Sequence, residues 1–146
     1  MLSVPPDLDQ GHARRGVVSA GTETGMESTH MSWPTKIETT RQELRALNAL
    51  IPDTARAFGG LGKAVKEGGT LDFKVKEFVA LGIAVATKCE PCIALHMEAL
   101  IRTGATREEV GDVLAMSIQM GGGPAMMYAA KALACYDELS EKGQPA

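Results

Sequence analysis

The sequence predicts an all-α protein. From Trp33 onward, apolar residues recur at intervals of three and four, which is the spacing of one face of a helix. Gly and Pro divide this pattern into segments of helix length, and no pair of segments carries the turn chemistry of a β-hairpin. The length of 146 residues argues for a single domain.

The first 31 residues differ in composition from the rest. They contain no aromatic residue and no Cys, but two Pro and four Gly. Such a segment cannot bury enough apolar surface to offset its ordering entropy, so we expect residues 1–31 to be disordered and residues 32–146 to form the helical domain. No signal-peptide core or run of about 18 apolar residues occurs, so we expect a cytoplasmic location with reduced thiols and no membrane partner.

The first three predicted helices cover residues 39–51, 52–68 and 73–88. Pro52 separates the first two, because Pro suits the first turn of a helix and ends the helix before it. A pair of glycines, Gly68 and Gly69, ends the second helix. Thr70 or Asp72 then caps the third, because short polar side chains accept the free N–H groups of a first turn.

The last three predicted helices cover residues 91–104, 106–120 and 124–141. Pro91 fits the first turn of the fourth helix, and Gly104 ends it. Thr106 and Glu109 have the spacing of a capping box, which opens the fifth. The three glycines at 121–123 lack both phosphate-loop frames and follow a helix, so we interpret them as a hinge or a point of close backbone approach.

Four methionines flank this glycine run, and we interpret them as core fillers or subunit contacts. They are Met116, Met120, Met126 and Met127. Cys135 lies among Ala and Leu residues, so we predict a buried core thiol there. Three cysteines are too few, and odd in number, for a disulfide-stapled secreted scaffold.

Charge and aromatic content exclude nucleic acid as a partner. The formal net charge is −3, which gives no electrostatic reason to bind nucleic acid or an anionic membrane. Aromatic residues make up 4% of the chain, too few for the stacking platforms that bind sugars or single strands.

The chemistry is concentrated in the segment Cys89-Glu90-Pro91-Cys92, followed by His96. Residues three and four apart share one face of a helix, so Cys92 and His96 should lie side by side, with Cys89 at the helix start. The thiolate is the reactive form of Cys, and a helix N-terminus or an imidazole lowers its pKa from about 8.5. A second Cys within reach condenses with a sulfenic acid to form a disulfide.

Glu77 lies in an apolar run on the preceding predicted helix. A carboxylate that is buried there needs a partner, and we expect that partner to be the pair of Cys92 and His96. His has an ordinary pKa of about 6.5, so it accepts a thiol proton near neutrality.

Two other interpretations of these residues stay open. Cys89, Cys92 and His96 could form most of a zinc site with Glu77 as fourth ligand, in a zinc-binding or redox-sensing module without turnover. They could also be two core thiols and a hydrogen-bonded His with no chemistry. A thioredoxin-like oxidoreductase is excluded, because that fold needs a βαβ context that the sequence lacks.

The spacing resembles that of the alkyl hydroperoxidase D family, within the carboxymuconolactone decarboxylase superfamily. The shared motif is a Glu, eleven residues, Cys-x-x-Cys, three residues and a His. The flanking stretches Lys-Glu-Phe-Val-Ala-Leu at 76–81 and Ile-Arg-Thr-Gly-Ala-Thr-Arg-Glu-Glu-Val at 101–110 are also similar, and the resemblance covers about residues 35–140. It implies an all-helical fold that assembles as a homotrimer or homohexamer.

The resemblance also implies a thiol-dependent peroxidase that acts on hydroperoxides, with no metal and no cofactor. Cys92 would be the peroxidatic thiol and Cys89 the resolving thiol, so that a Cys92 sulfenic acid becomes a Cys89–Cys92 disulfide. His96 and Glu77 would form a proton relay. The electron donor would be a dithiol of the lipoyl or thioredoxin type.

One position departs from the family pattern. The best-known members carry a His immediately before the second Cys, where this chain has Pro91. The decarboxylases of the superfamily act on a lactone acid and generally lack the CxxC, so its retention here favours redox chemistry. A decarboxylase-type lyase is the alternative, although few basic residues near the motif are evident in the sequence to bind a substrate carboxylate.

Overall fold

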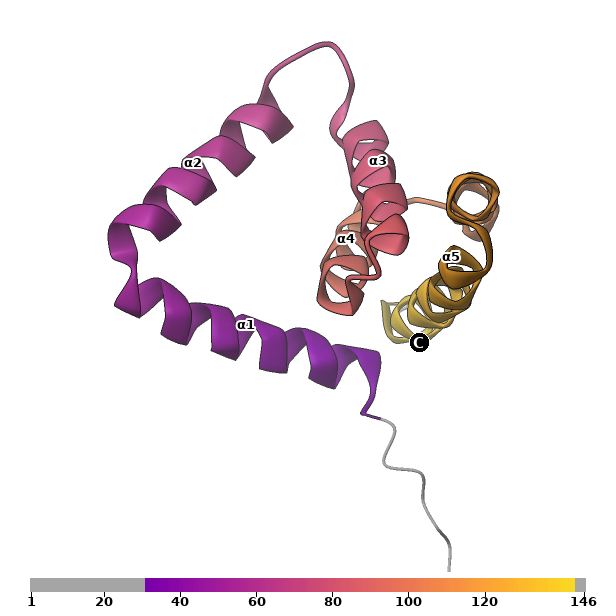
Figure 1. The fold of residues 1–146 in the computed structure, drawn as a ribbon, viewed down its shortest axis with the longest axis horizontal. Helices are drawn as coiled ribbons and strands as arrows, with labels where there is room; N and C mark the ends of the chain where they lie inside the picture. The colour runs from indigo at the N-terminus through magenta and orange to yellow at the C-terminus, as the bar shows by residue number, and fades with distance from the viewer. Residues whose placement is uncertain (1–30, 144–146) are drawn as a thin grey trace, which may run out of the picture.

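A computed structural model describes residues 31–143, which form helices joined by short turns (Figure 1). The described range contains no strand, so the predicted all-α fold is confirmed. The expected disorder of residues 1–31 falls, except for Met31, outside the described residues. The helices are α1 (Trp33–Leu50), α2 (Pro52–Glu67), α3 (Phe73–Ala86), α4 (Glu90–Arg102) and α5 (Arg107–Gly143).

α1 begins six residues earlier than its apolar spacing predicts. The Ser32 side chain accepts a hydrogen bond from the N–H of Thr35 at 3.4 Å, and Pro34 occupies the first turn. Both residues favour a helix start, and the added turns carry Trp33 and Ile37, which are the buried residues of α1.

The starts of α3 and α5 agree with the predicted caps. Asp72 Oδ1 accepts from the N–H of Val75 at 2.9 Å, which decides between the two candidate caps of α3. Thr106 and Glu109 form the predicted capping box, with N···O distances of 2.8 Å and 3.2 Å. These bonds satisfy N–H groups that a helix start leaves without a partner.

α5 contains the last two predicted helices, joined end to end. Gly122 separates them with φ of 65° and ψ of −153°, a conformation that side-chain-bearing residues avoid. A Cβ added at Gly121 would lie 2.6 Å from the Cβ of Ala125. The glycine run therefore kinks the helix, and the contact that leaves no room for a Cβ at Gly121 is with the Ala125 side chain; a hinge motion there stays a prediction.

The core lies between α3, α4 and α5, with the first turns of α1 packed against it (Figure 1). Its largest members, such as Leu81, Ile93 and Leu100, are fully buried. Cys135 is also fully buried, which confirms the predicted core thiol. None of the helices in the described range is long and apolar enough to cross a bilayer.

α1 and α2 extend away from this core as an open arm (Figure 1). Only Trp33 and Ile37, near the start of α1, are buried, and α2 buries no residue. Phe58 on α2 is 75% exposed. In the single chain, the apolar face of α2 therefore has little contact with the rest of the molecule.

The interpretation of the four methionines as core fillers is wrong. Met116, Met120, Met126 and Met127 are each more than half exposed. α5 turns other residues, such as Leu114 and Ala129, into the core, so the methionines lie on its outer surface, where Met116 and Met120 border a surface cavity beside α3. Their role as subunit contacts stays a prediction.

Candidate functional site

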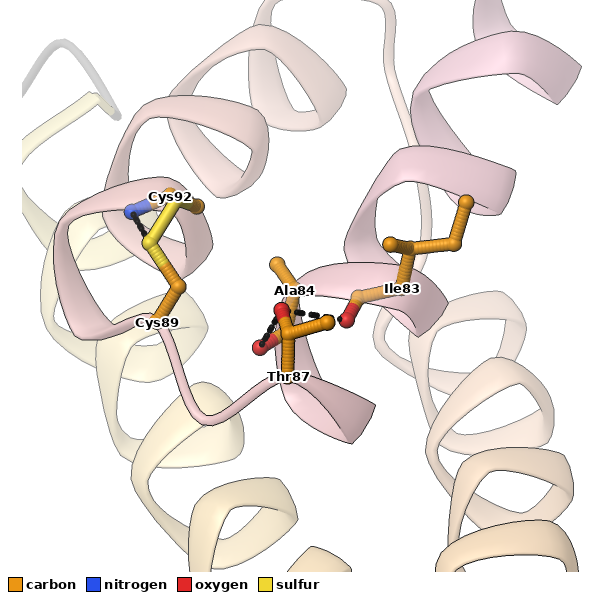
Figure 2. Close-up of a disulfide and its surroundings, with 5 residues drawn as sticks. All are labelled: Ile83, Ala84, Thr87, Cys89 and Cys92. Carbon is orange, nitrogen blue, oxygen red and sulfur yellow. Dashed lines mark hydrogen bonds between the residues drawn. A yellow bond between two sulfur atoms is a disulfide. The ribbon is translucent and has the colours of Figure 1, made fainter.

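The turn between α3 and α4 presents Cys89 at the start of α4 (Figure 2). The Thr87 hydroxyl donates to the carbonyl of Ile83 at 2.8 Å and closes the last turn of α3. Lys88 then adopts φ of 60°, and the Cys89 N–H donates back to the carbonyl of Ala84 at 3.0 Å. This is the Schellman arrangement that ends many helices, and it redirects the chain within three residues.

Cys89 and Cys92 are joined by a disulfide, with their Cα atoms 5.2 Å apart (Figure 2). Cys89 is the N-cap of α4, and its sulfur accepts a hydrogen bond from the N–H of Cys92 at 3.3 Å. Both residues are half-buried. The two sulfurs therefore lie at the positive end of the α4 dipole, where a thiolate formed on reduction is stabilised.

Glu90, between the two cysteines, ties the motif to two other helices. It forms ion pairs with Lys131 of α5 and, at 3.2 Å, with Lys36 of α1. The hydrogen bond from Lys131 is the main cause that lowers the pKa of Glu90, opposed by burial and assisted by Lys36. Sequence reasoning missed this role, because both lysines lie more than 40 residues from Glu90 and no local spacing indicates the pairs.

Glu77 lies on α3 and is only 1% exposed. Its Oε2 is 2.6 Å from Nδ1 of His96 on α4, so one member of the expected pair, His96, is the partner of Glu77. The hydrogen bond of Cys92 goes to the Cys89 sulfur instead. Burial raises the pKa of Glu77, but hydrogen bonds from Lys66 and His96 outweigh burial and hold it below its usual value.

This geometry assigns the proton on the His96 ring. An ionised carboxylate only accepts hydrogen bonds, so Nδ1 of His96 must donate to Glu77. In a neutral ring the other nitrogen, Nε2, then carries no proton and can accept one. The pair of Glu77 and His96 therefore has the arrangement of a proton acceptor held by a carboxylate.

Lys66 is a third member of this group that the sequence analysis missed. Its Nζ lies 2.7 Å from Oε1 of Glu77, on the opposite carboxylate oxygen from His96. Lys66 comes from α2, across a turn from Glu77, and a lysine in a polar helix end gives no signal of such a contact. The buried carboxylate is thus shared by a cation and an imidazole.

A cavity of about 240 Å³ opens beside these residues, between α2 and the helices α3 and α4. Its lining joins the polar group of Lys66, Glu77 and His96 to an apolar wall and to a second lysine, Lys76. The apolar wall consists of Phe58, Leu61, Val65 and Ala80. Two lysines at this cavity correct the expectation that few basic residues lie near the motif.

No metal site forms from the predicted candidates. Within residues 31–143, no three His, Cys, Asp or Glu side chains lie together as a set that could hold a metal ion. Cys89 and Cys92 are bonded to each other, and Nδ1 of His96 faces Glu77. The zinc interpretation therefore has no preformed ligand set in this geometry.

Cys135 stands apart from the other two cysteines. Burial is the main cause that raises the pKa of its thiol, to about 12. The thiol therefore keeps its proton at neutral pH and is a poor nucleophile. The three cysteines divide into a pair at a helix start and one packing residue.

The chain is similar to proteins of one known family. The sequence model of the carboxymuconolactone decarboxylase family matches residues 52–134. An uncharacterised protein of Cupriavidus necator is 41% identical over 106 residues, which span 73% of this chain and 94% of the relative.

Two solved structures share the fold. A carboxymuconolactone decarboxylase family protein from Legionella pneumophila has a TM-score of 0.71 at 37% identity, over 74% of this chain and 96% of that one. A protein of the same family from Thermotoga maritima, whose description suggests an involvement in antioxidative response, has a TM-score of 0.65 at 28% identity, over 74% of this chain and 92% of that one.

Proposed function

The chain belongs to the carboxymuconolactone decarboxylase family, and we propose that it is a thiol-dependent peroxidase that reduces hydroperoxides. One observation carries the proposal: a CxxC pair caps α4, and the same helix holds His96 against the ionised carboxylate of Glu77. The description of the similar Thermotoga protein agrees with a role in antioxidative chemistry.

In the first proposed step, Cys92 attacks the peroxide. His96 accepts the thiol proton, and the Cys92 thiolate attacks the distal oxygen of the hydroperoxide, so that a sulfur–oxygen bond forms and the O–O bond breaks. The alkoxide that leaves takes the proton from His96. One thiol and one hydroperoxide thus become a Cys92 sulfenic acid and an alcohol.

In the second proposed step, Cys89 resolves the sulfenic acid. The Cys89 sulfur attacks the Cys92 sulfur, the Cys89–Cys92 disulfide forms, and water leaves. The distance of 5.2 Å between the two Cα atoms supports this step, because it lies in the range of ordinary disulfides.

In the third proposed step, an external dithiol resets the site. The donor, of the lipoyl or thioredoxin type, attacks the disulfide, leaves as its own disulfide and returns both cysteines to thiols. Such donors are reduced in the cytoplasm, where we propose that the protein acts.

The test measures hydroperoxide consumption with a dithiol donor. We expect Cys92→Ser to abolish it and Cys135→Ser, a matched control at a buried thiol, to retain it. We expect Cys89→Ser to hold a sulfenic acid at Cys92 that dimedone traps. Equal rates in wild type and Cys92→Ser would exclude the mechanism, and a trapped sulfenic acid at Cys89 in Cys92→Ser would reverse the two roles.

A lyase acting on small carboxylated lactones is the second candidate, which the family match and the lysines at the cavity favour. Both lysines are already engaged, however, because Lys66 pairs with Glu77 and Lys76 donates to backbone carbonyls of Lys66 and Gly68. A lyase would keep its activity when both Cys89 and Cys92 are replaced by Ser. Loss of all activity in that double variant would exclude it.

We also propose that the chain works as a homotrimer or homohexamer. Large apolar side chains are exposed on the arm and on the outer faces of α3 and α5, more than a monomer usually shows. They include Leu50, Phe58, Leu61, Val65, Val79, Ile83, Met116, Met120, Met126 and Met127. Light scattering at micromolar concentration tests the assembly, and a monomer there would contradict it.

A further inference from the structure

One charged side chain, Lys66, connects α2 to the thiol site, by which we mean Cys89, Cys92, His96 and Glu77. Lys66 is 46% exposed, yet its Nζ lies 2.7 Å from a carboxylate that is 1% exposed. α2 buries no residue of its own, so this contact is not a by-product of close packing between α2 and the core. The ammonium of Lys66 pairs with a buried carboxylate, although α2 has little other contact with the core. This contact points to a role of Lys66 in the site.

Two further contacts hold Lys66 in this place. Lys76, on α3 next to Glu77, donates to the carbonyl of Lys66 at 3.3 Å and to that of Gly68, which fixes the end of α2 against the start of α3. The Lys66 ammonium also lies 5.4 Å from the ring centroid of Phe73, within the range of a cation–π interaction. The position of the ammonium is therefore set by α3 as well as by α2.

The charges around Glu77 explain what the ammonium does. The carboxylate has two partners in the described structure, Lys66 on one oxygen and His96 on the other. If the ammonium were absent, the buried negative charge would favour a doubly protonated His96 as its counter-ion. Such a ring has no lone pair and cannot take a proton from a thiol. With Lys66 in place, the carboxylate already has a cation and can hold a neutral ring.

We propose that Lys66 is a positioning residue of the thiol site, which acts through Glu77 to keep the His96 ring able to accept a proton. Its role rests on the proposed function, in which Cys92 is the thiol that the ring serves. α2 is then part of the site rather than only a surface for assembly, because the arm must lie against α3 for Lys66 to reach Glu77.

The other charged groups near His96 do not replace Lys66. Among the described residues, the cavity is lined by Lys66 from α2, by Lys76 and Glu77 from α3, and by His96 from α4. Lys76 directs its ammonium to backbone carbonyls, and Cys135, on α5, is a buried thiol that keeps its proton. Lys66 is the cation that contacts Glu77.

The test follows the pH dependence of Cys92 alkylation by iodoacetamide in the reduced full-length protein, with the modified peptide identified by mass. When Lys66 is removed, the ring becomes doubly protonated, and an imidazolium beside a thiol stabilises the thiolate. We therefore expect Lys66→Met and Lys66→Gln to move the midpoint of Cys92 alkylation to lower pH by about one unit, and to speed alkylation below the wild-type midpoint by up to about tenfold. Lys66→Arg retains the charge and should keep the midpoint close to that of wild type.

Lys63→Met is the matched control, because Lys63 is an exposed lysine on the same helix, and we expect it to leave the midpoint unchanged. A Lys66→Met protein that folds and keeps the wild-type midpoint would overturn the proposal, whatever its rate. A midpoint that Lys66→Arg shifts as far as Lys66→Met would overturn it as well.

NMR titration of the His96 ring separates this proposal from the proposed function. The ring should gain its second proton at higher pH in Lys66→Met than in wild type, whether or not Cys92 reacts with peroxide. If Cys92→Ser retains peroxidase activity, the proposed function fails while the ring titration still tests Lys66. If the ring titrates alike in both proteins, the role of Lys66 fails while the peroxidase test stands.

Discussion

α4 and α2 both send a side chain to Glu77, but they hold that side chain in different ways. α4 buries five residues, among them Ile93, Met97 and Leu100, so His96 is carried by a helix packed into the core. α2 buries none, and Lys66 is carried by a helix held at its end. His96 is thus fixed by packing, while Lys66 depends on a few polar contacts.

Because of this difference, substitutions in α4 should mainly affect the stability of the fold, and substitutions in α2 should mainly affect the charge around Glu77. Changes in α4 should unfold the protein, because apolar burial is the main stabilising contribution to a fold. Changes in α2 should leave the subunit folded and alter charge or assembly. The expected effects of substitutions therefore decrease from the core to the outer surface of the arm.

The largest effect is expected from a cavity in the core. Leu100 is fully buried, so Leu100→Ala should lower the free energy of unfolding by about 2–5 kcal/mol. Leu61 on α2 is 59% exposed, and Leu61→Ala should change it by less than about 0.5 kcal/mol in the monomer. Urea denaturation at several protein concentrations measures both. Equal losses that do not depend on concentration would show that α2 packs within the subunit.

A smaller effect on stability is expected from the carboxylate of Glu77, whose ion pair with Lys66 joins the core to the arm. The folded pKa of Glu77 lies below its ordinary value of 4.5, so the unfolded chain binds more protons in the interval between the two values. The stability that Glu77 contributes is therefore present above pH 4.5 and lost as the pH falls through the folded pKa.

Glu77→Gln removes this contribution and isolates it from other carboxylates with lowered pKa, such as Glu90 and Asp137. Its free energy of unfolding should fall less steeply than that of wild type as the pH drops below 4.5. Parallel curves for the two proteins in urea denaturation would contradict an ionised, paired Glu77.

A still smaller change in the free energy of unfolding is expected at the turn that connects the arm to the core. Asp72 caps α3 just after the turn from α2, and Asp72→Ala should lower the free energy of unfolding by about 1 kcal/mol. Asp72→Ser or Asp72→Asn keeps a cap and should recover most of the loss. Thermal unfolding checks the series, and an Ala variant as stable as wild type would mean that the cap does not stabilise α3.

The smallest effect is expected on the outer surface of the arm. Arg56 and Asp53 form an ion pair on α2 at 2.9 Å, with side chains 75% and 90% exposed. Solvent and salt screen such a pair, so Arg56→Ala should leave the melting temperature unchanged within error. A clear drop at low salt that vanishes at high salt would show that the arm depends on its surface charges.

The parts of this account that follow from the sequence are the local ones. Helix starts such as Asp72 and the break at Gly122 are encoded within a few residues, and the spacing of Cys92 to His96 places both on α4. The pairing of Glu77 with His96 was also predictable, because a buried carboxylate requires a partner on a neighbouring helix.

Contacts between distant segments could not be predicted in this way. Lys66 reaches Glu77 across a turn, and Glu90 is held by lysines of α1 and α5, so both depend on how the helices are arranged in space. The methionines beside Gly122 have the composition of a core, but only the fold shows that they face outward. Hydrophobicity alone does not distinguish a core residue from one that another subunit would cover.

The most direct test of the central claim is a single turnover. Reduced protein receives one equivalent of an organic hydroperoxide without a donor, and peptide mass analysis follows the three cysteines. The account predicts one alcohol formed per chain, one Cys89–Cys92 disulfide and an unmodified Cys135. Unconsumed hydroperoxide, with Cys89 and Cys92 still present as thiols, would contradict it.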